Sequence, residues 1–469
     1  MKKNDYKMKT SYIKFMAVVS VMSFALAAVA QTPQSSYFLE GMVQRHELNA
    51  AFGGESNYVA IPGLSGMEIG LSTNFGAGDF FFQRGSELVT GLSSQVSAEE
   101  FLGGLPANNR LEFNFEMPNL SVGFRGMGGF NTIVLKERTF FSANVPSTLF
   151  EFLKVGENIS TPMPAAHYEV ENLSLYTDNF VEIALGHSRK LAALEGFSYG
   201  AKLKFLAGLF NGGINMRHMD INLSANEWTV SSQGEAYLSS GMEYVYDEEG
   251  NLSGIEMVSY RLGGYGFGVD LGVAYTPEAL PGLTVSLGVN DLGFISWQKV
   301  TNAVSEGSYT FTGFDILGDD SAPIEDQLSE LAEDVVDMFN LKPTAPVNHT
   351  RMLQTTLNVG AEYSILQRKI SFGILSSTRF GAPYTYAEGM AVVNFRPCHW
   401  FQAAINGSVS NLGAAVGALI NICPNGVNMF AACDYISPHM KFSKEGLTLT
   451  GMRFNFRTGL IIAFGKGIK

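Results

Sequence analysis

The chain has 469 residues, of which 46% are hydrophobic and only 16% are charged, whereas an average soluble domain has roughly 25% charged residues. Its mean hydropathy of +0.09 excludes a disordered chain, and its three cysteines exclude a scaffold held together by disulfides. The formal net charge is −13, and it becomes −17 when the five lysines and one aspartate of residues 1–30 are left out. So large a negative charge disfavours nucleic acid as a partner.

The N-terminus is predicted to be a secretory signal peptide over residues 1–30. Five lysines precede an apolar run from Phe15 to Ala30, and Ala28-Val29-Ala30 supplies the small residues of a cleavage site. We expect cleavage after Ala30, with an uncleaved membrane anchor as the alternative. Because no later stretch approaches about 18 uninterrupted apolar residues, the mature chain is predicted to have no transmembrane helix.

Alternation with a period of two residues predicts strands along the mature chain. Between Tyr265 and Tyr275, aromatic and aliphatic residues alternate with glycine, alanine and Asp270. Common strands have about five or six residues, whereas this run has the length that a tilted, membrane-spanning strand needs. The same pattern recurs in residues 111–116, 120–124, 197–208, 283–290, 353–363 and 451–464.

These segments favour an all-β fold, a closed antiparallel transmembrane β-barrel of about 14 strands within a range of about 12 to 16. A soluble β or α/β globule is the alternative. In hydrocarbon each unpaired backbone group costs several kcal/mol, so strands that cross a membrane must close into a ring. A Lys or Arg facing lipid at mid-depth costs roughly 2–4 kcal/mol. We therefore expect the charged residues of these strands to face a polar lumen, namely Glu112, Glu116, Lys202, Lys204, Arg453 and Arg457.

The connections fit a barrel with short turns at one end and long loops at the other. Residues 277–282 and 366–369 are predicted to be short turns, Pro118-Asn119 is predicted to turn the chain, and residues 291–352 are predicted to form a long external loop. Within that loop, residues 324–339 carry apolar residues along one stripe and acidic residues elsewhere, which predicts an amphipathic helix. We place this helix in the loop or over the barrel mouth; packing on other loops is equally compatible with the pattern.

Several motifs resemble an uncharacterised family of Bacteroidota outer-membrane β-barrel proteins. They are SYFLEG at 36–41, RHELN at 45–49, SVGFRGMGGFNT at 121–132, VEIALGHSRK at 181–190, YGAKLKFL at 199–206 and FNFRTGLIIAF at 454–464. Ala50 stands where that family tends to have proline. The family is loosely similar to the FadL-like transporters and to the type IX secretion shuttle barrel, and the resemblance implies no established activity.

The resemblance to FadL-like barrels, in which an N-terminal segment plugs the lumen, implies a division of the mature chain. Residues 31–60 are a candidate plug, and residues 61–469 are the predicted barrel. Arg45, His46 and Glu47 form the one dense ionisable triplet of the N-terminal segment. We expect them to be the contacts between the plug and the inner wall.

The sequence predicts no catalytic, cofactor or metal site. The seven histidines show no HExxH motif and no pairing with cysteine or carboxylates at ligand spacing. The Gly-His-Ser-Arg run at 186–189 lacks the second glycine of a nucleophile turn. Cys423 and Cys433 flank a predicted turn and are compatible with a disulfide in an oxidising compartment, although unpaired, buried thiols are the favoured interpretation.

Three functions remain open at this stage. The favoured one is passive transport of a small or hydrophobic solute, and the alternative is a non-transporting barrel that acts as a surface scaffold or as a partner of a secretion or assembly complex. An outer-membrane enzyme is disfavoured, and we expect no enzyme activity. The expected location is the cell outer membrane. The expected partners are outer-membrane lipid, the barrel-assembly machinery during biogenesis and a small hydrophobic solute.

Overall fold

The computed structural model describes residues 34–54, 56–60, 66–85, 87–155, 166–223, 228–239, 241–246, 252–257, 261–311, 338–381, 383–424, 426–436, 440–443, 446–449 and 453–464. The predicted signal peptide at 1–30 lies outside these residues. So does the predicted helix at 324–339, except for its last two residues, Met338 and Phe339.

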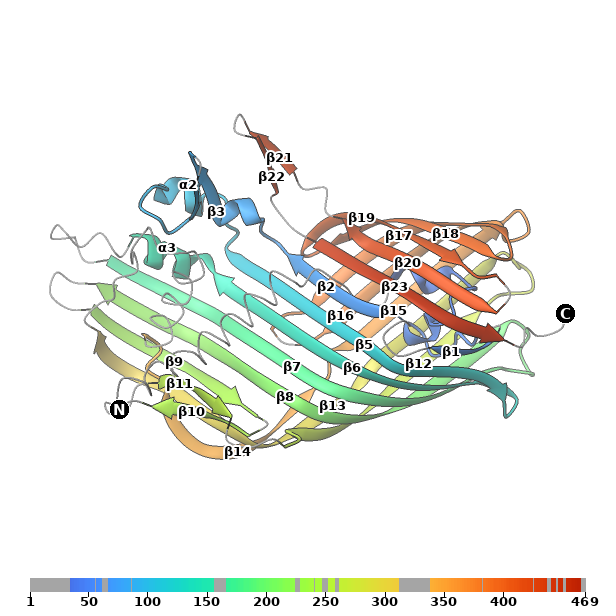
Figure 1. Cartoon of the computed structure of the whole chain (residues 1–469), viewed down its shortest axis with the longest axis horizontal. Helices are drawn as coiled ribbons and strands as arrows, with labels where there is room; N and C mark the ends of the chain where they lie inside the picture. The colour runs from blue at the N-terminus through green and yellow to red at the C-terminus, as the bar shows by residue number, and fades with distance from the viewer. Residues whose placement is uncertain are drawn as a thin grey trace.

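A ring of antiparallel strands forms the body of the molecule (Figure 1). Each strand bonds to the next along the ring, and β23 closes it by pairing with β20 on one side and with β1 and β2 on the other. The strands of the wall are β1 (Asn57–Ala60), β2 (Met67–Thr73), β5 (Asn108–Gly126), β6 (Gly129–Pro146), β7 (Ala166–Lys190), β8 (Phe197–Leu223), β12 (Gly264–Tyr275), β13 (Leu283–Phe311), β15 (Thr355–Ile365), β16 (Ile370–Phe380), β17 (Tyr386–Cys398), β18 (Phe401–Ser410), β19 (Gly413–Ile422), β20 (Val427–Ile436) and β23 (Arg453–Phe464).

Closure of the ring confirms the predicted fold class. β1 and β2 both pair with β5 and with β23, so they follow one another at a single place in the wall. Among the described residues the wall therefore has 14 strand positions, the number expected from the sequence. No described helix is long and apolar enough to cross a membrane.

The two faces of the wall differ as the alternation predicts. In β12, Tyr265 is 56% exposed and Leu271 is 47% exposed, whereas Asp270 between them is 1% exposed. In β8, Leu203 is 47% exposed while Lys202 and Lys204 are buried. Apolar side chains thus cover the outside of the ring and charged side chains lie within it. An outer surface of this kind is stable only against an apolar surrounding such as the acyl chains of a bilayer.

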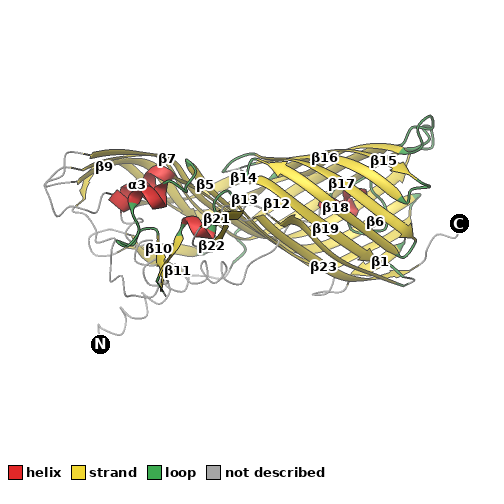
Figure 2. Cartoon of the chain, turned by 90° about the horizontal axis from the view of Figure 1, so that it is seen from above, coloured by secondary structure: helices red, strands yellow, loops and turns green. Residues whose placement is uncertain are grey.

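Beyond the ring, several strands continue as a curved sheet that we call the extension (Figure 2). The second half of β8 pairs with β9 (Trp228–Leu238), and the second half of β13 pairs with β9 and with β14 (Lys342–Met352). In β7 and β8 the large exposed apolar side chains end at Ile183 and Phe205, and residues 166–178 and 210–223 have none. The parts of β7 and β8 in the extension therefore lie outside the apolar belt.

The extension corrects the prediction that residues 291–352 form one long loop. Residues up to Phe311 belong to β13, and residues from Lys342 belong to β14. The loop was expected because the alternation identified in the sequence stops at residue 290. Leu292 and Phe294 still continue the apolar outward face, but residues 295–308 of β13 have no large apolar side chain exposed on that face. In the extension, however, that face meets water, so a strand there does not carry the pattern of a membrane strand.

One face of the extension has its own apolar core. Helix α3 (Ser147–Val155) packs Phe152 against the sheet, where Met219 and Trp228 are also buried. Met338 and Phe339 complete the same cluster. The remaining described elements are α2 (Ala98–Leu102), the 3-10 turn η3 (Ala77–Asp79), and the hairpins β3 (Phe81–Arg84) with β4 (Glu87–Thr90), β10 (Met242–Tyr246) with β11 (Leu252–Met257), and β21 (Met440–Ser443) with β22 (Gly446–Leu449).

The predicted turns are confirmed in two cases and wrong in one. Residues 277–282 join β12 to β13, and residues 366–369 join β15 to β16. Pro118-Asn119, by contrast, lies inside the single strand β5, where the pairing with β6 shifts by one residue. Proline has no backbone N–H to donate, and a bulge accommodates it without ending the strand.

Residues 34–54, which we call the inner segment, lie within the ring (Figure 1). The segment contains two 3-10 turns, η1 (Gln34–Phe38) and η2 (Arg45–Glu47), and Tyr37, Phe38 and Leu39 are almost fully buried. The segment is shorter than the predicted range of 31–60. Residues 57–60 form β1, in which buried Tyr58 and Ala60 alternate with half-buried Asn57 and Val59, and this strand pairs with β23.

Candidate functional site

The lumen of the ring is the candidate site, and its wall has a glycine surface facing the inner segment. Gly200 of β8, Gly272 of β12 and Gly288 of β13 are in register across three neighbouring strands. A Cβ at Gly272 would lie 2.7 Å from the amide nitrogen of Ala51, and one at Gly288 would lie 3.2 Å from the carbonyl oxygen of Leu48. We call these three glycines the glycine seat, because only residues without side chains let residues 48–51 approach so closely.

Polar side chains of the wall bind the backbone of the inner segment on several sides. Asn290 and Asn358 both donate from Nδ2 to the carbonyl oxygen of Leu48, at 2.9 and 3.0 Å. Asn428 donates to the carbonyl oxygen of Gly41 at 2.9 Å, and Arg396 donates to that of Phe38 at 2.6 Å. These donors come from β13, β15, β17 and β20, so the segment is held from much of the ring.

Within the segment, the chain turns at Asn49, whose Oδ1 accepts a hydrogen bond from the Ala51 amide at 2.9 Å. The Asn49 Nδ2 donates to the Tyr37 hydroxyl at 3.0 Å, and that hydroxyl also lies 3.0 Å from Ser286 Oγ on the wall. The side chain of Asn49 thus closes the turn, and it does so next to Ala50, the position at which the family motif tends to have proline.

The predicted triplet has three different environments. Arg45 stacks over the ring of Phe52, with 4.0 Å between the guanidinium carbon and the ring centre. His46 Nε2 lies 2.6 Å from the hydroxyl of Tyr58 on β1. Glu47 lies 3.6 Å from both Lys136 Nζ and Arg457 Nη2. His46 and Glu47 therefore contact the wall, whereas Arg45 packs against Phe52 within the segment itself.

Burial and charge shift the titration of this triplet. Burial lowers the pKa of His46 well below its usual value, and the positive charge of Lys202 adds to this effect. Burial by itself raises the pKa of Glu47, but Lys136 and Arg457 outweigh it and hold the pKa of that carboxyl below its usual range. At neutral pH the segment therefore presents a neutral imidazole and a carboxylate to the wall.

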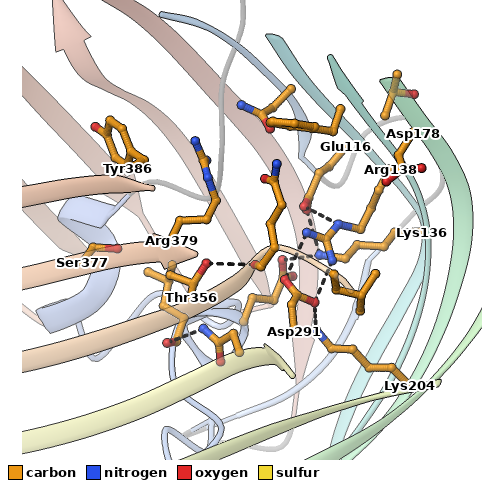
Figure 3. Close-up of a pocket in the computed structure, with 18 of the residues that line it drawn as sticks. Glu116, Lys136, Arg138, Asp178, Lys204, Asp291, Thr356, Ser377, Arg379 and Tyr386 are labelled. Atoms are coloured by element: carbon orange, nitrogen blue, oxygen red, sulfur yellow. Dashed lines mark hydrogen bonds and ion pairs between the residues drawn. The ribbon is translucent and has the colours of Figure 1, made fainter. Parts of the chain in front are cut away.

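On the wall, ion pairs join into a network (Figure 3). Glu47 is connected to this network through Lys136. Lys136 Nζ lies 2.7 Å from Glu116 Oε2, and Arg138 Nε lies 2.9 Å from Glu116 Oε1. Arg138 also binds both carboxylate oxygens of Asp291, at 2.8 and 3.1 Å. Paired donors of this kind fix both partners in orientation as well as in distance.

Lys204 is the other branching point of the network. Its Nζ lies 2.7 Å from Asp270 Oδ1, 2.6 Å from Asp291 Oδ1 and 3.7 Å from Glu182 Oε1. Lys202 lies 3.8 Å from Asp270 Oδ2. Lys204 and the carboxylates of Asp270 and Glu182 are buried, so the opposite charges compensate one another where water does not reach them.

A bulge in β13 brings Asp291 into this network. Asp291 has a φ of 59°, and the register of β12 with β13 shifts beside Asp270. As a result Asn290 and Asp291 are both buried although they are consecutive, and the Asp291 amide donates to Asp270 Oδ1 at 2.8 Å. Bulges commonly redirect a side chain in this way next to functional sites.

Further ion pairs lie inside the ring, among them that of Arg396 Nη2 with Glu362 Oε1 at 2.6 Å. Arg379 of β16 pairs with Glu112 of β5. Arg453 Nη2 lies 3.1 Å from Glu388 Oε1, and the hydroxyl of Tyr435 donates to the other oxygen of Glu388 at 2.6 Å.

A cavity of about 120 Å³ remains in the lumen beside the inner segment. Figure 3 shows Glu116, Arg138 and Asp291 on one side of it, with Arg379 and Tyr386 opposite. The cavity lining also includes Glu47 and Leu48 of the inner segment. The arrangement can bind a small molecule through charged and hydrogen-bonding groups, and nothing in the lining resembles a nucleophile activated by a base.

The comparison with protein families identifies the family of the chain. A family model described as "Family of unknown function (DUF5723)" matches residues 50–434. The chain belongs to the DUF5723 family. This match confirms the resemblance to an uncharacterised family that the motifs indicate. No curated protein matches this DUF5723 chain.

Solved structures similar to the DUF5723 barrel include transport proteins of very different sequence. The toluene transporter TbuX of Ralstonia pickettii is 8% identical, with a TM-score of 0.40, and the match covers 94% of this chain and 95% of that one. The toluene transporter TodX of Pseudomonas putida is 8% identical, with a TM-score of 0.36 and coverage of 93% and 96%. A FadL homologue of Pseudomonas aeruginosa is 11% identical, with a TM-score of 0.38 and coverage of 94% and 97%.

All six residues expected to face the lumen of the DUF5723 barrel are withdrawn from its outer surface, and all six form ion pairs. The side chains of Glu112, Lys202, Lys204, Arg453 and Arg457 are at most 6% exposed, and that of Glu116 is 15% exposed. Glu116, Lys202, Lys204 and Arg457 join the network around Glu47, whereas Glu112 and Arg453 belong to separate pairs. Sequence reasoning missed Arg138, Glu182, Asp270, Asp291, Arg379 and Glu388. Asp270 and Glu182 occur in segments that the alternation and the family motifs had already singled out.

Cys423 and Cys433 are both thiols, and they donate to the carbonyl oxygens of His399 at 3.4 Å and of Tyr435 at 3.5 Å.

The expectation that no histidine lies beside carboxylates at ligand spacing is wrong. His167, Glu169 and Asp220 come together in the extension. The neighbouring strands β7 and β8 bring them into contact. A motif within one stretch of sequence does not predict a contact between two strands.

Proposed function

We propose that the protein is a passive channel of the outer membrane for a small solute, and that the inner segment closes its lumen at rest. In this proposal the predicted signal peptide is cleaved after Ala30, and the barrel-assembly machinery inserts the chain among outer-membrane lipids. The observation that carries the proposal is the glycine seat. Three strands of the wall lack side chains at the place where residues 48–51 lie.

The way in which the inner segment is held supports reversible closure. Single donors of the wall, such as Asn290, Asn358 and Asn428, bind its backbone. One hydrogen bond contributes only about 0.5–1.5 kcal/mol net, because water replaces the partner when the bond opens. These hydrogen bonds to the backbone are separate from one another, and water or a solute is able to replace each of them.

The cavity lining supports a small polar solute rather than an apolar one. Glu116, Arg138, Asp291 and Arg379 line the space, and an apolar molecule would remove water from these groups without replacing its hydrogen bonds. A molecule that carries both donors and acceptors would replace them. A zwitterion or a small sugar is therefore a better match to this lumen than a hydrocarbon.

Liposome swelling with Gly272→Val tests the proposal. The valine collides with residues 49–51 and leaves every ion pair of the lumen in place, so it should displace the inner segment. We expect wild-type protein to admit a small sugar or a zwitterionic amino acid slowly, and Gly272→Val to admit both much faster. Gly407→Val is the matched control, because Gly407 faces outward and no other atom lies within 4 Å of its added Cβ.

Folding of each variant is checked first by its heat-dependent migration on gels, and Gly200→Val provides a second displacement of the same residues. Unchanged flux through both folded variants would refute closure by the inner segment.

The extension favours a second candidate, a non-transporting barrel that presents a docking surface. Its sheet has a separate apolar core around Phe152, Met219 and Trp228, so it is built to keep a fixed shape beyond the apolar belt. A barrel that passes no solute even when the inner segment is displaced, and that is recovered with a stoichiometric partner, would support this candidate over the channel.

A further inference from the structure

A cluster of potential metal ligands lies on the exposed face of the extension, away from the lumen. His167 Nε2 lies 3.4 Å from Glu169 Oε1 and 3.7 Å from Asp220 Oδ1. All three ligand atoms lie within 4.8 Å of one another. His167 and Glu169 are two residues apart on β7, and Glu169 is paired directly with Asp220 on β8, so the pleat of the sheet directs all three to one face.

These distances match the spacing of ligands around one zinc ion. Zn²⁺ binds histidine nitrogen at about 2.0–2.1 Å and carboxylate oxygen at about 2.0–2.2 Å, most often with four ligands in a tetrahedron. Two ligands at neighbouring corners of such a tetrahedron are about 3.3–3.5 Å apart. His167 Nε2 is already near this spacing from both carboxylates, at 3.4 and 3.7 Å. The carboxylate oxygens of Glu169 and Asp220 lie within 4.8 Å of one another, and rotation of the exposed Glu169 side chain is enough to bring them to the same spacing.

The surroundings orient two of the three ligands toward the shared point. His167 Nδ1 lies 2.9 Å from the amide oxygen of Asn222. This oxygen accepts a hydrogen bond from Nδ1–H and so favours the tautomer in which the lone pair of Nε2 faces the carboxylates. His218 Nε2 lies 2.8 Å from Asp220 Oδ2 and so occupies the oxygen of Asp220 that points away from His167. Hydrogen bonds of this kind to the outer atoms of ligands are typical of metal sites.

We propose that His167, Glu169 and Asp220 bind a divalent transition-metal ion, with Zn²⁺ as the best match, and that the fourth position is open to water or to an external ligand. One imidazole with two carboxylates favours such an ion over Ca²⁺ or Mg²⁺, which prefer oxygen ligands throughout. The opposite face of the same strands carries Val170, Met219 and Ile221 of the apolar core. The backbone beneath the site is therefore fixed, and the metal links β7 to β8.

The test uses the full mature chain in detergent, purified without a histidine tag and stripped of metal with a chelator. Calorimetric titration with Zn²⁺ should give one equivalent bound per chain, and titration with Co²⁺ should give the visible absorption of a tetrahedral complex. His167→Ala and Asp220→Asn should abolish both signals. All the substituted side chains face solvent, so folding should persist, and the heat-dependent gel shift verifies it.

Two further variants separate a built site from adventitious binding. Asn222→Ala removes only the group that orients His167, and it should weaken Zn²⁺ binding roughly 10- to 100-fold, as loss of such outer partners commonly does. His399→Ala removes an exposed histidine in the turn between β17 and β18 and should leave binding unchanged. The proposal is overturned if wild-type protein binds no Zn²⁺, which would mean that a protonated His167 alone bridges the carboxylates. It is equally overturned if His167→Ala and Asp220→Asn bind as wild type does.

Discussion

Replacing Lys204 by methionine should destabilise the barrel strongly, although the two side chains are similar in length. Lys204 Nζ contacts Asp270 at 2.7 Å and Asp291 at 2.6 Å, and only 6% of its side chain is exposed. Without this cation, three buried carboxylates, including that of Glu182, would depend on Arg138 and Lys202 alone. Loss of one partner from a buried ion pair commonly costs about 3–5 kcal/mol, because the remaining charge stays buried without compensation.

The assay is reversible urea unfolding in lipid vesicles, followed by tryptophan fluorescence, with the dependence on urea extrapolated linearly to water. We expect Lys204→Met to lower the free energy of unfolding by about 3–5 kcal/mol. The double variant Lys204→Met/Asp270→Asn should recover about 1–3 kcal/mol of this loss, since the charge left unpaired is then smaller. Lys369→Met, at an exposed lysine in the turn between β15 and β16, is the control and should change little.

A loss below about 1 kcal/mol for Lys204→Met, the range found for exposed ion pairs, would refute the reasoning. It would mean that water reaches the network and screens its charges. A double variant less stable than the single one would contradict the expectation that Lys204→Met leaves the charge of Asp270 without compensation.

Three other predictions concern the inner segment, the apolar belt and the metal cluster. Burial lowers the pKa of His46, so its protonation favours the unfolded chain. Stability should fall by at most about 2 kcal/mol from pH 8 to pH 5 through this group, and the difference should vanish from urea titrations of His46→Gln. Leu203→Arg, on the outer face of the ring, should cost roughly 2–4 kcal/mol in vesicles, whereas Gln233→Arg in the extension should cost almost nothing; equal costs would contradict the boundary of the belt. Zn²⁺ at a hundredfold excess over its Kd should raise the free energy of unfolding by about 2.7 kcal/mol, and Asp220→Asn should remove this gain; a gain that survives in the variant would contradict the site.

The membrane-facing part of the fold is predictable from sequence because lipid imposes a simple rule. Residues such as Leu203 and Leu271 must be apolar on one side, and Lys204 and Asp270 must then lie on the other, so period-two alternation identifies each strand. The extension follows a different rule, since water wets one of its faces and an apolar core covers the other. The part of β13 beyond Phe294 therefore resembles a loop when it is judged by the pattern of a membrane strand.

The candidate site was predictable only in part, for a related reason. Alternation predicts that Lys204 and Glu116 turn inward, but it does not say which partners they meet across the lumen. Asp291 turns inward because of the bulge in β13, and the regular alternation of the sequence does not predict that bulge. His167-x-Glu169 and His218-x-Asp220 do carry a signal, because residues two apart on a strand share a face. It becomes visible once the two segments are recognised as neighbouring strands.

The most direct test of closure by the inner segment is the current through single barrels before and after that segment is removed. A protease site placed between residues 54 and 56, next to exposed Gly53, allows cleavage after the barrel has folded, and mild urea then releases the fragment. Mass spectrometry verifies that the fragment has left and that the barrel is otherwise intact. We predict that barrels with the fragment bound carry almost no current in a planar bilayer and that barrels without it carry a steady one. An intact barrel that stays without current after complete release of residues 34–54 would contradict the account.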